Sequence, residues 1–202
     1  MEQTSRNQRG ASLAGALVTL TLCGIAATVA AANLASLRRS AALESSCRRL
    51  RTLVVRARTV AVASGRVTSL VMTRRPGGWR CYVARDGDGD GVHRRDLARG
   101  VDEVVSEVIR IEDRPAGLGI LRGVRIPDPS GRGRLRGDPD DPVRAGRGDI
   151  LTFTPWSTAT PATIYLTDGR SRMRAVRVFG ASARVRVLEW RVGWPRWRRV
   201  GW

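Results

Sequence analysis

Lysine is absent from this chain, and histidine, cysteine and aromatic residues are scarce. All 36 basic residues are arginines, and with 18 acidic residues they give a formal net charge of +18. Arginine used to the exclusion of lysine is typical of a GC-rich genome, so charge alone does not identify a nucleic-acid partner. The single histidine, His93, has no second histidine or nucleophile at a recognisable spacing and is expected in an exposed loop. Because triads and most general-base schemes need such a partner, the composition argues against an enzyme.

The three cysteines stand too far apart for a zinc site or a disulfide framework. Cys47 falls on the apolar stripe of a predicted helix, and Cys81 alternates with Trp79 and Val83 on one face of a predicted strand. Both are therefore expected at a helix–sheet interface. There they would be two buried free thiols or, in an oxidising compartment, a disulfide between Cys47 and Cys81.

What the chain does have is a long uncharged segment near its N-terminus, residues 10–37. As a helix with a rise of 1.5 Å per residue it would be roughly 40 Å long, and the hydrocarbon core of a bilayer is ~30 Å thick. Its many Ala, Thr, Ser and Gly residues favour close packing against other helices. This segment can cross a membrane and can also join a helical bundle.

The pattern continues beyond the uncharged segment. Apolar residues recur at steps of four and three, opposite a face rich in arginine, and the first strong stop is Gly65. The apolar stripe consists of Leu43, Cys47, Leu50, Val54, Ala57 and Ala61. The sequence therefore predicts one continuous helix over about residues 12–64.

Three simpler interpretations of the N-terminus remain open. A secretory signal peptide could be cleaved after the small residues Ala30, Ala31 and Ala32. A lipoprotein signal at Cys23 fits less well, because Leu22 precedes the cysteine where a small residue is expected. A plain membrane anchor is the third.

After Gly65, segments of period two indicate strands. Two pairs of segments are predicted as hairpins, 67–73 with 79–84 and 163–167 with 173–179. Three further segments, 101–111, 150–154 and 184–190, are predicted as single strands. Residues 127–148 are rich in Pro, Gly, Asp and Arg and are predicted to form a mobile surface loop. The predicted class is α+β, with a long N-terminal helix packed on an antiparallel β-sheet domain.

The N-terminus resembles the leader and spine helix of type IV pilins and pseudopilins. A short basic leader ends at Gly10, followed by Ala11-Ser12-Leu13-Ala14-Gly15, where the family usually has Phe-Thr-Leu-Ile-Glu. The resemblance implies a leader over 1–10, cleavage by prepilin peptidase that makes Ala11 the mature N-terminus, a spine helix over 11–64 and a globular domain over 65–202. The family's Glu is thought to pair with a neighbouring subunit's amine, so Gly15 implies a minor or terminal subunit.

The order of the later segments resembles the GspH/FimT group of minor pseudopilins. The matching features are residues 56–66 at the helix end, Gly78-Trp79, Phe153-Thr154-Pro155, residues 164–169, and Val176-Arg177-Val178 leading to Gly180. The resemblance implies a subunit of a type II secretion pseudopilus or a type IV pilus, which supports protein secretion or pilus assembly. It would sit in the bacterial inner membrane with its domain in the periplasm, and its partners would be other pilin or pseudopilin subunits.

The segment 86–91 alternates aspartate with glycine, like the first half of a calcium loop. The second half is missing, because the twelfth position is Leu97 rather than Glu. Either Asp86, Asp88, Asp90 and Asp96 hold a weakly bound calcium, or the segment is a glycine-rich turn with solvated acids.

The C-terminal residues 190–202 interleave tryptophan with arginine, a combination that stacks on bases and neutralises phosphates. This favours an alternative function, a DNA-binding minor pilin for DNA uptake, through Arg191, Arg196, Trp197, Arg198 and Arg199. The competing interpretation is that the tryptophans cover a sheet edge or contact a neighbouring subunit.

Overall fold

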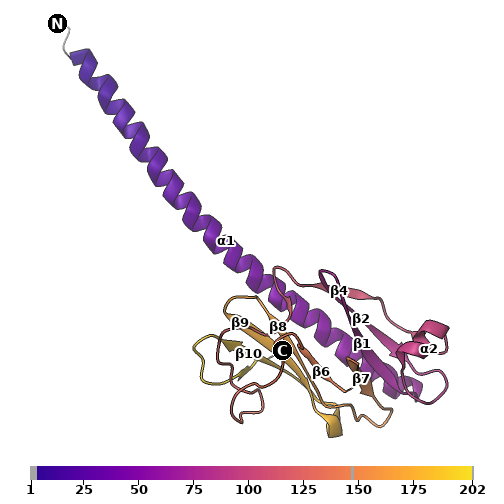
Figure 1. The fold of residues 1–202 in the computed structure, drawn as a ribbon. Coiled ribbons are helices and arrows are strands. Elements are labelled where there is room, and N and C mark those ends of the chain that lie inside the picture. Colours follow the sequence, from indigo (N-terminus) through magenta and orange to yellow (C-terminus); the bar gives the residue numbers. More distant parts are fainter. Residues whose placement is uncertain (1–3, 147, 202) are drawn as a thin grey trace. The chain divides into compact units, whose positions relative to one another are not determined.

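The computed structural model describes the backbone of residues 4–146 and 148–201, and the side chains of 13–31, 33–146 and 148–201. The chain divides into two compact units, Met1–Arg39 and Ser40–Trp202. Helix α1, Thr4–Ser64, forms the described part of the first unit and the first element of the second (Figure 1). The predicted α+β class, a long N-terminal helix with antiparallel β-sheets, is confirmed.

In the first unit, every side chain that the structure describes up to Arg38 is exposed. Leu20 and Leu37 are 69% and 66% exposed. The hydroxyls of Thr19, Thr21 and Thr28 donate to backbone carbonyls three or four residues earlier, so these polar groups are satisfied within the helix itself. By length and composition this helix could cross a membrane.

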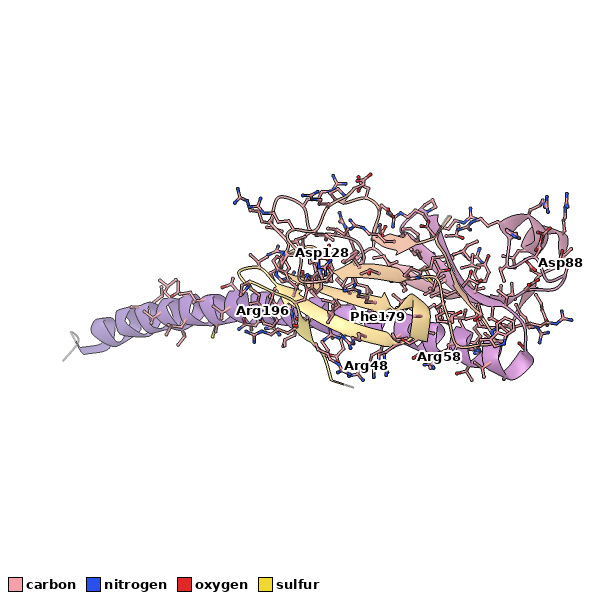
Figure 2. All side chains as sticks on the ribbon, turned by 90° about the horizontal axis from the view of Figure 1, so that it is seen from below. Arg48, Arg58, Asp88, Asp128, Phe179 and Arg196 are labelled. Carbon is pink, nitrogen blue, oxygen red and sulfur yellow. The ribbon has the colours of Figure 1, made fainter. Side chains whose placement is uncertain are left out.

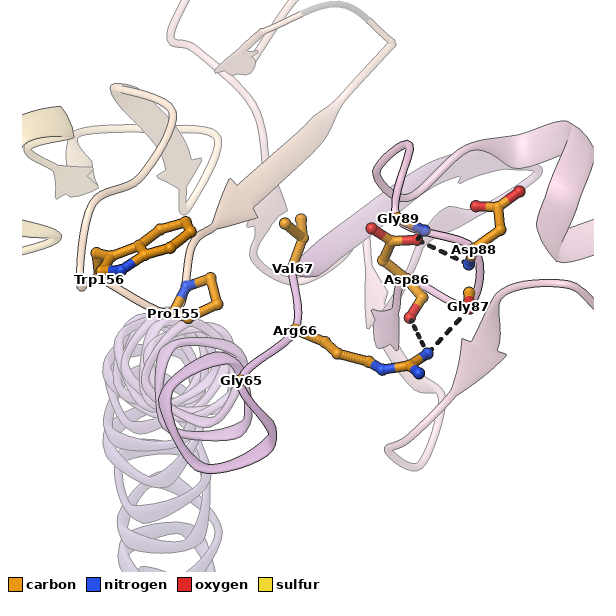
Figure 3. A pocket seen from close by; sticks show the side chains of 9 residues that line it. All are labelled: Gly65, Arg66, Val67, Asp86, Gly87, Asp88, Gly89, Pro155 and Trp156. Atoms are coloured by element: carbon orange, nitrogen blue, oxygen red, sulfur yellow. Dashed lines mark hydrogen bonds between the residues drawn. The ribbon is translucent and has the colours of Figure 1, made fainter.

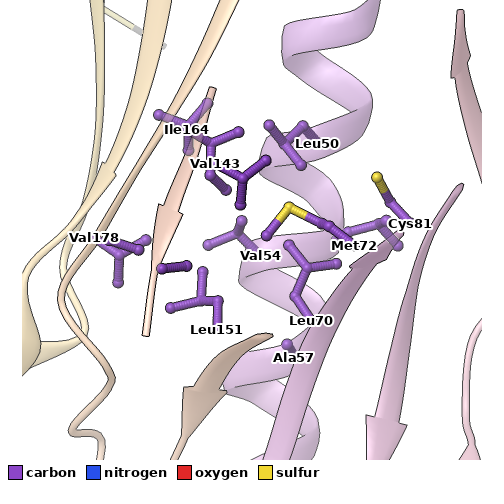
Figure 4. Close-up of a cluster of buried hydrophobic side chains, with 14 of the residues drawn as sticks. Leu50, Val54, Ala57, Leu70, Met72, Cys81, Val143, Leu151, Ile164 and Val178 are labelled. Atoms are coloured by element: carbon purple, nitrogen blue, oxygen red, sulfur yellow. The ribbon is translucent and has the colours of Figure 1, made fainter. Parts of the chain in front are cut away.

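In the second unit, α1 turns its predicted apolar stripe into the core. All six stripe residues, from Leu43 to Ala61, are buried, and they share one cluster with residues of both sheets (Figure 4). The opposite face carries exposed arginines at Arg48, Arg49 and Arg56. The helical periodicity read from the sequence is therefore confirmed residue by residue in this part of α1.

The first sheet forms around a hairpin of β1 (Thr68–Arg75) and β2 (Gly78–Arg85). Its strand order is β3-β2-β1-β7, and β4 also pairs with β2. The remaining strands are β3 (Glu103–Val104), β4 (Ile109–Glu112) and β7 (Ile150–Phe153). The return of β7 to β1 is reinforced by the hydroxyls of Ser69 and Thr152, 2.9 Å apart. This long-range pairing places β7 at one edge of the first sheet.

The second sheet has the order β11-β10-β9-β8-β5, with β6 also paired to β8. Its strands are β5 (Gly117–Leu118), β6 (Val143–Ala145), β8 (Ala162–Thr167), β9 (Arg172–Val178), β10 (Val185–Arg191) and β11 (Arg198–Arg199), and the short helix η1 (Gly180–Ser182) joins β9 to β10. One face contributes to the helix-covered core, and the other carries a second cluster that includes Tyr165 and Trp190.

Two local expectations differ from the structure, and one short helix was not expected. The single strand expected over 101–111 is divided into β3 and β4, because the hydroxyl of Ser106 accepts the N–H of Val83 where a backbone carbonyl would continue the ladder. The loop expected over 127–148 contains β6, which is fixed by pairing with β8. The short helix α2 (Arg94–Arg99) was not expected, and it ends at Gly100 in the left-handed conformation, φ 75°.

Candidate functional site

The predicted processing site, Gly10 and Ala11, has its backbone within α1, but its side chains lie outside the described residues. Cleavage at Gly10 therefore stays a prediction. The described side chains that follow include nine large exposed apolar residues, which are Leu13, Leu17, Val18, Leu20, Leu22, Ile25, Val29, Leu34 and Leu37. These side chains can contact lipid chains or other apolar helices.

The acidic loop, residues 86–91, follows β2 and is organised by two buried carboxylates. Asp86 accepts N–H bonds from Asp88 at 3.2 Å, Gly89 at 2.7 Å and Gly91 at 3.0 Å. Asp102 accepts N–H bonds from Gly87 at 3.1 Å and His93 at 2.8 Å. The two acids therefore cap the loop backbone, which explains their burial.

The structure only partly gathers the predicted calcium ligands. Carboxylate oxygens of Asp86, Asp88 and Asp102 lie within 4.8 Å of one another. Asp90 Oδ1 lies 3.7 Å from His93 Nε2, and the pKa of Asp90 is raised by loss of hydration and by the hydrogen bond and charge of Asp88.

Asp96 is also separate, and its Oδ1 accepts a bond from Arg95 Nε at 3.3 Å. Three carboxylates match the oxygen ligands that calcium prefers, although backbone N–H groups already occupy part of the capacity of Asp86 and Asp102. Calcium stays a prediction, and its third ligand would be Asp102, which nothing in the 86–97 pattern indicated.

A cavity of about 310 Å³ lies beside the acidic loop (Figure 3). Pro155 and Trp156 form one side and the loop forms the other, and Trp156 is 83% exposed. Arg66 lies between them and donates to the backbone carbonyls of Asp86 and Gly87. The titratable side chains that line the cavity are Arg66, Asp86 and Asp88.

The C-terminal tail is folded onto the second sheet, where β11 pairs with β10. Trp197 packs at 6.2 Å from Tyr165 and 6.3 Å from Trp190, and its Nε1 donates to the carbonyl of Pro127 at 2.7 Å. The Trp194 ring lies under two guanidinium groups, Arg191 at 5.1 Å and Arg198 at 4.2 Å.

The ring faces that base stacking requires are thus already in contact with the chain's own residues at Trp194 and Trp197. The predicted arginines Arg191, Arg196, Arg198 and Arg199 are exposed. They could neutralise phosphate groups, so DNA contact stays a prediction that depends on charge more than on stacking.

Glu189, on β10, is a buried carboxylate that sequence analysis missed. Its Oε1 accepts bonds from Arg172 at 2.9 Å and Arg191 at 2.8 Å, and its Oε2 from Arg174 at 3.4 Å. Arg172 also donates to the hydroxyl of Ser40 at 2.7 Å. The sequence does show Glu189 as a lone acidic residue among arginines, which could have indicated an ion-pair cluster. The register that places Glu189 opposite Arg174, and Arg191 opposite Arg172, was not predicted.

The pKa of Glu189 reflects two opposing effects. Burial acts to raise it, but the hydrogen bonds from Arg172 and Arg191 and the charges of Arg172 and Arg174 outweigh burial and hold it below its ordinary value of 4.5. The carboxylate is therefore ionised at neutral pH, and the cluster keeps an excess of positive charge.

Cys47 and Cys81 are both buried at the helix–sheet interface, as predicted from their positions. Both are free thiols here, and burial raises the pKa of Cys47 to about 11 and of Cys81 to about 12. They behave as small apolar core residues in this structure.

Comparison of the chain with family models, with curated proteins and with solved structures gave no match.

Proposed function

We propose that the chain is a minor subunit of a type II secretion pseudopilus or a type IV pilus. Prepilin peptidase would cleave it after Gly10, and the first half of α1 would anchor it in the bacterial inner membrane with the second unit in the periplasm. The subunit would then join a filament by exchanging lipid for the apolar helices of neighbouring subunits. Its role is assembly, in support of secretion or of pilus formation.

One observation carries this proposal. Along a single helix, the described side chains through Arg38 are all exposed, whereas from Leu43 onward a regular stripe is fully buried. Full burial of a side chain such as Leu or Ile is worth about 1.5–3 kcal/mol, so nine large exposed apolar residues imply a covering environment. Lipid before assembly and sister helices after assembly would both supply it.

Site-specific photo-crosslinking in a cell that carries the assembly machinery tests the proposal. A photoreactive residue at Leu20, 69% exposed, should form adducts with other pilin-like subunits. The matched control at Leu50 should give no intermolecular adduct, because that side chain is buried in the chain's own core. A chain that stays in the membrane and gives no subunit adduct at Leu20 would be a plain anchor, which contradicts the proposal.

A further inference from the structure

We propose that the second unit binds the headgroups of anionic phospholipids through a basic surface close to Ser40. The surface consists of Arg172, Arg191, Trp194, Arg196 and Arg198, and is called the basic belt below. The inference rests on the membrane insertion in the proposed function, and it adds a lipid class and the residues that contact it.

The position of the belt follows from the covalent chain and one hydrogen bond. The uncharged segment ends at Leu37, and Ser40 is the third residue after it. At 1.5 Å per residue this is roughly 5 Å along a helix, and the headgroup layer extends several Å beyond the hydrocarbon on each side. If Leu37 reaches the hydrocarbon edge, Arg172, whose Nη1 lies 2.7 Å from Ser40 Oγ, lies at the depth of the headgroups.

Arg191, Trp194 and Arg198 are linked to Arg172 by direct contacts, and Arg196 lies between Trp194 and Arg198 in the sequence. Glu189 holds Arg172 and Arg191 through the same oxygen, at 2.9 and 2.8 Å. Arg191 lies over the Trp194 ring, and the Arg198 guanidinium lies 4.2 Å from the same ring centroid. The contacts therefore run without interruption from Ser40 to the C-terminal tail.

The chemistry of the belt suits a phosphate at a membrane surface. Guanidinium groups bind phosphate oxygens in a bidentate manner, and tryptophan is enriched at membrane interfaces. The Arg191, Arg196 and Arg198 side chains are exposed, so their outer N–H groups can reach a headgroup.

One observation favours lipid over DNA as the source of that phosphate. The Trp194 and Trp197 rings already contact Arg191, Arg198, Tyr165 and Trp190, which removes the stacking surface that single-stranded DNA would need. The acidic loop with Asp88 lies at the far end of the unit from Arg196, so its carboxylates do not oppose an anionic surface at the belt (Figure 2).

Energy transfer from tryptophan to labelled lipid in nanodiscs tests the inference on the full-length chain. Nanodiscs of phosphatidylcholine would carry trace dansyl-phosphatidylglycerol or dansyl-phosphatidylcholine. Transfer to the anionic probe should exceed transfer to the zwitterionic one, and this preference should weaken as salt is raised.

The double variant Arg196→Gln/Arg198→Gln should lose the preference, by up to about fivefold for each arginine. The matched control is Arg95→Gln/Arg99→Gln on α2, whose exposed arginines adjoin the acidic loop. This control should keep the preference of the wild type.

Carbonate extraction of membranes that contain the same chain separates the two proposals. A chain that resists extraction but shows equal transfer to both probes overturns the lipid assignment and leaves membrane insertion intact. A chain that carbonate releases overturns insertion, and the lipid inference with it. Binding of duplex DNA that requires Arg196 and Arg198, with no lipid preference in the wild type, would assign the belt to DNA instead.

Discussion

Replacing Glu189 with glutamine should destabilise the second unit strongly, although it changes few atoms. Glu189 is 8% exposed and accepts bonds from Arg172, Arg174 and Arg191. Removing its charge takes the counter-ion from the partly buried Arg172, and breaking a buried ion pair in this way costs about 3–5 kcal/mol. For a chain of this size each kcal/mol lowers Tm by roughly 2–4 °C, so the loss should be on the order of 10 °C.

The pH dependence of this loss can be given a sign. The folded pKa of Glu189 lies below its ordinary value of 4.5, so its contribution to stability is complete above that value and is lost as pH falls through the folded pKa. The difference in Tm between wild type and Glu189→Gln should be full at pH 7 and should shrink below about pH 4.5.

Thermal unfolding followed by tryptophan fluorescence in detergent measures this difference, because Trp190 is the next residue. Glu103→Gln is the matched control, since Glu103 pairs with Arg85 at a side chain that is 62% exposed. Exposed pairs contribute about 0–1 kcal/mol, so the control should unfold close to wild type. A Glu189→Gln variant that unfolds with the control at pH 7 would refute the assigned role of the cluster.

Three further predictions concern the core, the acidic loop and the thiols. Leu50→Ala should lower the free energy of unfolding by about 2–5 kcal/mol in guanidinium titrations, whereas Val62→Ala, at a side chain 51% exposed, should change it little. Equal losses in the two variants would contradict the helix–sheet packing. Titration calorimetry of the full-length chain with millimolar calcium should give a binding heat that is absent in Asp88→Asn. A wild-type chain that gives no binding heat would rule out the calcium site. Iodoacetamide at pH 8 should leave Cys47 and Cys81 unmodified in the folded protein, because burial raises their pKa to about 11 and about 12. Mass spectrometry that finds either thiol alkylated before unfolding would disprove their burial.

Local patterns in the sequence were enough for the helix and most strands. The stripe from Leu43 to Ala61 follows the 3.6-residue period, and the hairpin pairs Met72 with Cys81 around a short glycine turn. These features depend on neighbours in sequence.

The errors arise where distant residues decide the structure. Pairing of β7 with β1, and of β6 with β8, joins segments whose own patterns do not specify the partner. Asp102 enters the acidic loop, and Arg172 meets Ser40 and Glu189, only through the folded register. The candidate site was therefore predictable in composition, as an acidic loop and an Arg/Trp tail, but not in its contacts.

The mature N-terminus of the native protein is the most direct test of the proposed function. Intact-mass analysis and N-terminal sequencing of the chain extracted from membranes would identify it. Cleavage by prepilin peptidase predicts a chain that begins at Ala11 and retains the whole apolar segment. A chain that keeps residues 1–10, or one that begins near Asn33 and is released in soluble form, would contradict assignment to a pilus or pseudopilus.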